Sequence, residues 1–153
     1  MRRQSGSVIV EFALSFFLIF WTFSGMFEYG YAFFAYNNME NAVRDGARYA
    51  SNYPYSSTST TPDTTYSTNV QNMVLYGTPS PANNATPVVA GLTSSNVNIT
   101  MTPGTSGGTL TPPAYVTVSI QNFTIDVFFG TVTFNGKPTV TFPYTGILTP
   151  PSS

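Results

Sequence analysis

The stretch GSVIVEFALSFFLIFWTFSGMFEYG, residues 6–30, contains the strongly apolar run of this chain. Within it, residues 8–27 are mostly Phe, Leu, Ile, Val and Trp. At 1.5 Å of rise per residue they form about 30 Å of helix, which is the thickness of the hydrocarbon core of a bilayer. The rest of the 153-residue chain offers little apolar helix against which this one could be buried. The stretch therefore predicts a membrane-spanning helix.

The composition narrows the range of functions. Only 7% of the residues are charged, against roughly 25% in an average soluble protein. The absence of cysteine and histidine excludes disulfides, thiol catalysis, Cys/His metal sites and histidine acid–base chemistry. The net charge of −1 and the lack of a basic stripe give no reason to expect nucleic acid as a partner. No carboxylate pair, activated nucleophile or phosphate loop is present, so we expect neither an enzyme nor a cofactor.

The helix is expected to continue beyond the membrane. No proline follows the apolar run until Pro54, and Glu40 with Arg44 forms a favourable pair one turn apart. We therefore expect one helix over about residues 5–51, with its first part in lipid and its second part projecting outward. Gly46 is the weak point of the outer part, because glycine costs about 1 kcal/mol relative to alanine in a helix.

The flanking charges predict the orientation of the helix. Arg2, Arg3 and the terminal amine precede the apolar run, and the positive-inside tendency places that end in the cytoplasm and the C-terminal region outside. A cleaved secretory signal peptide is the alternative. Against it, the apolar run is longer than the usual apolar core of about 7–15 residues, and no A-x-A cleavage site follows it.

A stripe of mostly small residues follows one face of the expected helix. Small residues let another helix or a sheet approach closely, and in membranes they favour helix packing. Either another subunit or the protein's own β domain could cover the outer half of the stripe, and both alternatives stay open. The stripe consists of Gly25, Glu28, Ala32, Ala35, Met39, Ala42, Gly46 and Tyr49.

Glu11 is a carboxylate inside the apolar run. It lies about 10 Å from the middle of the span by helix rise. An unpaired carboxylate near the bilayer centre costs about 2.5–3.5 kcal/mol on insertion scales, and somewhat less toward the interface. Snorkelling or protonation without any role is one interpretation. Glutamate is short and snorkels poorly from this depth. The favoured interpretation is therefore that Glu11 meets a positively charged partner, and meets it only in an assembly.

These residues match a known pattern. A short basic leader, MRRQSG, ends in glycine and is followed by a glutamate at the fifth position, which resembles a type IV prepilin. The segments GSVIVEFAL, GMFEYG and NAVRDGARYAS together resemble the TadE-like minor pilins, or pseudopilins, of tight-adherence pilus systems. The resemblance covers roughly residues 6–51. The family often carries proline shortly after EFAL, whereas this chain has Ser15-Phe16-Phe17, which predicts a straighter helix.

The resemblance implies how the protein is processed. A prepilin peptidase on the cytoplasmic side would cleave after Gly6, and Glu11 of a neighbouring subunit would then neutralise the new amine of Ser7. Two charges that are unfavourable alone in lipid become acceptable as a pair. For Glu28 the resemblance implies only that such a residue recurs, and we expect it to make a contact at the outer leaflet.

The resemblance also implies a function and partners. We expect a structural subunit that takes part in assembly, priming or capping of a tight-adherence pilus or related secretion filament. Its partners would be major and minor pilin subunits, the prepilin peptidase, an inner-membrane assembly platform and the lipid bilayer. It would lie in the bacterial inner membrane, with incorporation into an extracellular pilus as a further stage. The alternative is an uncleaved single-pass envelope or adhesion protein anchored in the membrane.

The chain divides into four parts: a leader (1–6), a transmembrane and extended helix (7–51), a polar Ser/Thr/Pro-rich linker with loops (52–95) and an antiparallel β domain (96–153). Within the linker, NVQNMVLYG (69–77) predicts one or two turns of helix ending at Gly77. The polar segment before it, residues 51–69, is interpreted as a disordered spacer or as a loop docked on the domain.

The last part of the chain has strand patterns. NVNITM and YVTVSIQNF alternate apolar and polar residues, and Asn135-Gly136 between two alternating runs predicts a hairpin. We expect three to five strands in an antiparallel sheet, with one face packed on the outer half of the helix. The fold class is therefore α+β and pilin-like. The expected apolar contributors, which could alternatively form an exposed adhesive or subunit interface, are Phe128, Phe129, Phe134, Phe142 and Tyr144.

Overall fold

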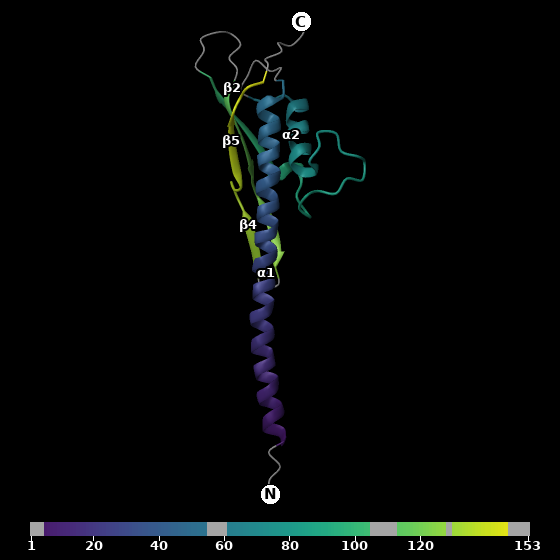
Figure 1. Cartoon of the computed structure of the whole chain (residues 1–153), viewed down its shortest axis with the longest axis vertical. Coiled ribbons are helices and arrows are strands. Elements are labelled where there is room, and N and C mark those ends of the chain that lie inside the picture. Colours follow the sequence, from purple (N-terminus) through teal and green to yellow (C-terminus); the bar gives the residue numbers. More distant parts are fainter. Residues whose placement is uncertain (1–4, 55–60, 105–112, 128–129, 147–153) are drawn as a thin grey trace.

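A long helix carries a small domain on its outer half (Figure 1). The computed structural model describes residues 5–54, 61–104, 113–127 and 130–146. The elements in chain order are α1 (Ser5–Asn52), α2 (Thr64–Tyr76), the short 3-10 helix η1 (Ser94–Asn96), β1 (Val97–Pro103), β2 (Pro113–Ile120), β3 (Phe123–Val127), β4 (Gly130–Phe134) and β5 (Thr139–Pro143). The α+β prediction is confirmed. Most of the predicted leader lies outside the described residues.

The helix α1 is continuous over 48 residues, as the sequence predicts. Its segment from Gly6 is long and apolar enough to cross a membrane, and the most apolar window is wholly uncovered by the rest of the protein. From Ala35 onward one face of α1 is buried instead. The helix therefore has an uncovered inner half and an outer half that forms part of the core.

The carboxyl end of α1 is held by residues from distant parts of the chain. The carbonyl of Ala50 has no donor from the helix itself, because residue 54 is a proline and lacks an N–H. The hydroxyl of Tyr66 in α2 donates to it over 2.5 Å. The backbone N–H of Thr145 donates to the carbonyl of Ser51 over 2.9 Å. The helix end is thereby tied both to α2 and to the segment that follows β5.

The helix α2 is longer than expected. It begins at Thr64 rather than near residue 69, because Asp63 caps it by accepting a hydrogen bond of 2.6 Å from the N–H of Tyr66. It ends at Gly77, which adopts the left-handed conformation that glycine tolerates. Part of the segment interpreted as a spacer is therefore helical, and Tyr66 and Val70 are fully buried.

The strands form two sheets rather than one. The first has the order β1-β2-β5 and the second pairs β3 with β4; all pairs are antiparallel. The expected hairpin at Asn135-Gly136 is wrong, because β4 does not pair with β5. Gly136 instead donates its N–H to the carbonyl of Ile120, and Ile120 donates to the carbonyl of Pro138. The chain is thereby led from the second sheet onto the free edge of β2.

The core lies between α1, α2 and the inner face of the three-stranded sheet. Residues opposite each other on that face include Met101, Val116 and Phe142 in one row and Ile99, Val118 and Val140 in the next. The prediction that Phe134, Phe142 and Tyr144 pack on the core is confirmed. Phe128 and Phe129 lie outside the described residues. The predicted packing of one sheet face on the helix is also confirmed, since β2 and β5 both contact α1.

Candidate functional site

The inner end of α1 presents the residues expected to govern processing and assembly. Gly6, Ser7 and Glu11 all lie in the helix and are exposed. Ser7 and Glu11 are four residues apart and therefore share one face, one turn from each other. A Cβ atom added at Gly6 would meet no heavy atom within 4 Å. Folding of the chain therefore does not require glycine at this position.

The surface around Glu11 is almost entirely apolar. Of the 20 large hydrophobic side chains that are exposed in the described part of the chain, 18 lie on α1 between Val8 and Phe34. Aromatic rings line up one turn apart along it, with 6.4 Å between the ring centroids of Phe12 and Phe16 and again between those of Phe16 and Phe20. Lipid or other apolar helices must cover such a surface in the native environment.

The structure shows what covers the outer part of the small-residue stripe. Ala35, Met39, Ala42 and Gly46 are buried by the protein's own domain. Further in, Gly25, Glu28 and Ala32 are only half-buried. The sequence left open whether another subunit or the protein's own β domain covers the outer half of the stripe. In the structure, the β domain and α2 cover it.

Glu28 lies where the domain begins. It lines a cavity of about 180 Å³ together with Ala32 and with Val127, Gly130 and Val132 from β3 and β4. Its Oε1 atom is buried. The carboxylate is thus turned toward the two-stranded sheet rather than outward from the helix. Its expected contact at the outer leaflet stays a prediction.

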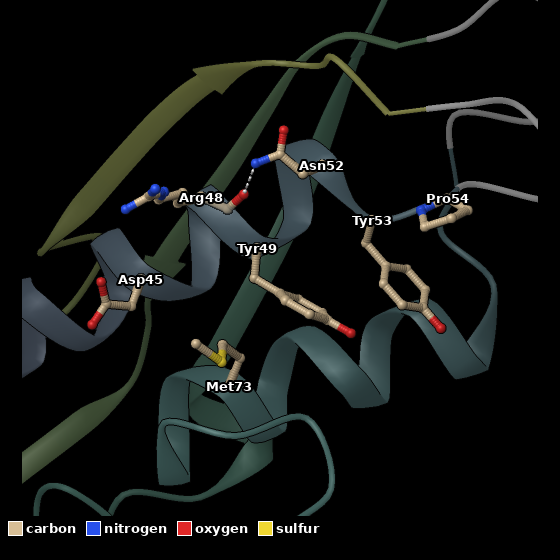
Figure 2. Close-up of a pocket in the computed structure, with 7 residues that line it drawn as sticks. All are labelled: Asp45, Arg48, Tyr49, Asn52, Tyr53, Pro54 and Met73. Atoms are coloured by element: carbon tan, nitrogen blue, oxygen red, sulfur yellow. Dashed lines mark hydrogen bonds between the residues drawn. The ribbon is translucent and has the colours of Figure 1, made fainter.

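A groove of about 380 Å³ lies at the outer end of the molecule, between α1 and α2 (Figure 2). Tyr49 in α1 and Tyr53, which directly follows α1, point toward α2, with their rings stacked at 5.1 Å between centroids. Burial raises the pKa of Tyr49, and the nearby Tyr53 raises it further. The groove is lined by Asp45, Arg48, Tyr49, Asn52, Tyr53, Pro54 and Met73.

Sequence reasoning missed this groove. The spacing of Tyr49 and Tyr53 by one helical turn was visible, but the groove also needs Met73, and only the packing of α2 on α1 brings that residue into place. Its charged members belong to the RDGARYAS segment. Within the described ranges, no group of three or more carboxylate side chains is placed to hold a metal ion.

Comparison with known proteins gives a match that lies within α1. Residues 6–48 match the family model described as TadE-like protein. The match confirms the resemblance read from the sequence and supports a TadE-like protein of Tad pilus systems. It lies on a helix that is long and apolar enough to cross a membrane. The family is structural rather than enzymatic. No curated protein matches the chain, and no solved structure matches it.

Proposed function

We propose that this protein is a pilin-like structural subunit that takes part in assembly, priming or capping of a tight-adherence pilus or a related secretion filament. The observation that carries the proposal is Glu11. It is an exposed carboxylate on the apolar inner half of α1, five residues after Gly6, in a segment that matches the TadE-like family model.

The energetic cost of Glu11 supports an assembly role. Glu11 is exposed, and where the inner half of α1 lies in lipid an unpaired carboxylate opposes insertion by up to about 2.5–3.5 kcal/mol. Cleavage after Gly6 by a prepilin peptidase creates a cationic amine at Ser7. When the amine of one subunit meets Glu11 of its neighbour, the two charges neutralise each other, so the desolvation cost becomes a preference for the assembled state.

The length of the uncovered helix also supports packing against other subunits. The exposed apolar surface runs from Val8 to Phe34, which is about 39 Å of helix. The hydrocarbon core of a bilayer is about 30 Å thick. The helix therefore carries more apolar surface than the hydrocarbon core covers, and in our proposal the helices of neighbouring subunits cover the remainder.

The proposed topology follows from the charges around the helix. Arg2 and Arg3 precede the span, so we place the N-terminus in the cytoplasm and the domain outside the inner membrane. In this arrangement the peptidase and an inner-membrane assembly platform both have access to the inner end of α1. The substitution Gly6→Leu tests the peptidase step cleanly, because the folded chain has space for a side chain there.

The assembly role is tested by comparing Glu11→Leu with Ser15→Leu in the native cell. Both changes make an exposed position of α1 more apolar, but only the first removes the carboxylate. We expect the Glu11 variant to enter the membrane as well as the wild type does and to lose recovery in cross-linked complexes with other pilin subunits. The Ser15 variant should keep those complexes. Equal cross-linking in both variants would contradict the proposal and favour the uncleaved, statically anchored envelope protein.

A further inference from the structure

The outer face of the three-stranded sheet carries a regular array of uncharged polar side chains. The register places Thr100, Thr117 and Thr141 opposite one another across β1, β2 and β5. On either side of this central row lie two more rows on the same face, because side chains two residues apart on a strand point the same way. These rows are Thr102, Tyr115 and Pro143, and Asn98, Ser119 and Thr139.

The array faces away from the core. Val116, Val118 and Ile120, which alternate with its members along β2, are fully buried in the core, where β2 contacts α1. Thr100, Thr141 and the other edge-strand threonines are exposed, and Tyr115 is 49% exposed. Ser119 alone is nearly covered. The face is therefore open to a ligand along both outer strands and at the Tyr115 end.

The hydroxyl groups of the array are already oriented by one another. The Oγ1 atoms of Thr117 and Thr141 are 2.8 Å apart, and Asn98 donates to Thr100 over 3.2 Å. A threonine hydroxyl has one donor and two acceptor positions, so each keeps capacity for a ligand after its bond within the sheet. Neighbouring strands lie about 4.8 Å apart and alternate residues on a strand about 6.8 Å apart. The result is an array of hydrogen-bonding groups at the regular spacing of a sheet.

The absence of charge restricts what such a face can recognise. Outer faces and edge strands of antiparallel sheets commonly carry lysine or glutamate, which keep the face solvated and prevent pairing with other sheets. None of the nine residues of this array is charged, although both β1 and β5 are edge strands. An anionic polymer or a lipid headgroup would gain nothing from it by charge. A neutral ligand rich in hydroxyl groups fits the donors and acceptors, and Tyr115 offers a ring on which a sugar face can stack.

We propose that this face, defined by Asn98, Thr100, Thr102, Tyr115, Thr117, Ser119, Thr139, Thr141 and Pro143, binds a neutral polysaccharide by hydrogen bonds from its threonine rows and by stacking on Tyr115. This activity would make the protein an adhesive subunit as well as a structural one. It does not depend on cleavage after Gly6 or on Glu11, so its failure and that of the assembly role are separable.

The test measures binding of the full chain in lipid nanodiscs to insoluble cellulose and chitin, with alginate beads as an anionic probe. The variant Thr100→Val, Thr117→Val, Thr141→Val removes three hydroxyl groups while keeping β-branched side chains that favour strands. The matched control is Thr124→Val with Thr133→Val, because these two residues form a similar exposed pair, 3.2 Å between Oγ1 atoms, on the other sheet. Thr141→Val alone, on an edge strand, covers the case in which the triple variant does not fold.

We expect the wild type and the control to bind cellulose, chitin or both with similar association constants. The triple variant should bind about tenfold or more weakly, and Thr141→Val should show a smaller loss. Binding that is equal in the wild type and the threonine variants would overturn the proposal. The proposal would also be overturned if the wild type bound alginate but neither cellulose nor chitin, or bound no polysaccharide at all. Binding to the lipid of empty nanodiscs instead of to polysaccharide would overturn it as well.

Discussion

Gly46 of α1 lies directly against Val74 of α2. A Cβ atom at Gly46 would overlap the Cγ2 atom of Val74 and would lie 3.7 Å from the carbonyl oxygen of Val70. Val74 is fully buried and α2 is capped at both ends, so neither can move aside freely. The glycine that weakens α1 as an isolated helix is therefore what lets the two helices pack closely.

Gly46→Ala should lower the stability of the domain. The gain in helix propensity is about 1 kcal/mol, whereas overpacking a closed contact costs typically about 1–3 kcal/mol, so we expect a net loss. Gly30→Ala is the control, because a Cβ there would meet no atom within 4 Å. Thermal denaturation followed by near-ultraviolet circular dichroism should show a lower Tm for the first variant only. A Tm for Gly46→Ala at or above that of the wild type would show that α2 can shift away from α1.

Tyr66→Phe should destabilise the carboxyl end of α1. The variant leaves the carbonyl of Ala50 without its donor in a buried position, and an unsatisfied buried acceptor costs about 1–3 kcal/mol. Tyr115→Phe removes a hydroxyl from an exposed tyrosine and serves as the control. Urea unfolding monitored by tyrosine fluorescence should separate the two variants. Equal midpoints would mean that water replaces the Tyr66 hydroxyl without loss.

Asp63→Ala should loosen the start of α2. Loss of an N-cap side chain costs about 1 kcal/mol, and here it also frees the N–H of Tyr66. Asp63→Ser retains a capping oxygen and should lie close to the wild type. Amide hydrogen exchange over residues 64–68 is the direct measurement. Faster exchange in the alanine variant alone is expected, whereas unchanged exchange would remove the reason we give for the early start of this helix.

The domain should lose stability at alkaline pH through Tyr49. Burial and, secondarily, Tyr53 raise the pKa of Tyr49 above its ordinary value of 10.0. Because the folded state disfavours the tyrosinate, this stabilisation is complete below pH 10 and falls as the pH rises through the pKa of the folded state. Tyr49→Phe should therefore show a shallower decline of Tm between pH 9 and 11. Parallel declines in the two proteins would contradict the assignment to Tyr49.

Local signals predicted α1 well. A continuous apolar run without proline fixes a helix by itself, and the structure ends α1 within one residue of the expected position. The start of α2 at Thr64 was missed, because the polar composition of residues 51–69 pointed to a spacer. Whether a polar segment folds depends on residues such as Tyr66, whose burial requires α1 as a partner.

The strand connections and the groove could not be predicted in the same way. Asn135-Gly136 is a strong hairpin signal, but Gly136 donates its N–H to the carbonyl of Ile120, which lies 16 residues earlier, and β5 pairs with β2 rather than with β4. The groove at Tyr49 likewise requires Met73 from another helix. Both features arise from contacts between segments that are distant in sequence, and the pattern within one segment does not contain that information.

Processing and pairing at the inner end of α1 are best tested by the mature N-terminus of the protein from its native cell envelope, measured by intact mass or N-terminal sequencing. We expect a chain that begins at Ser7, with the free amine that pairs with Glu11 of a neighbour. A chain that still begins at Met1 would contradict it, because Glu11 would then have no such partner amine. A start beyond residue 23 would contradict the membrane anchor as well.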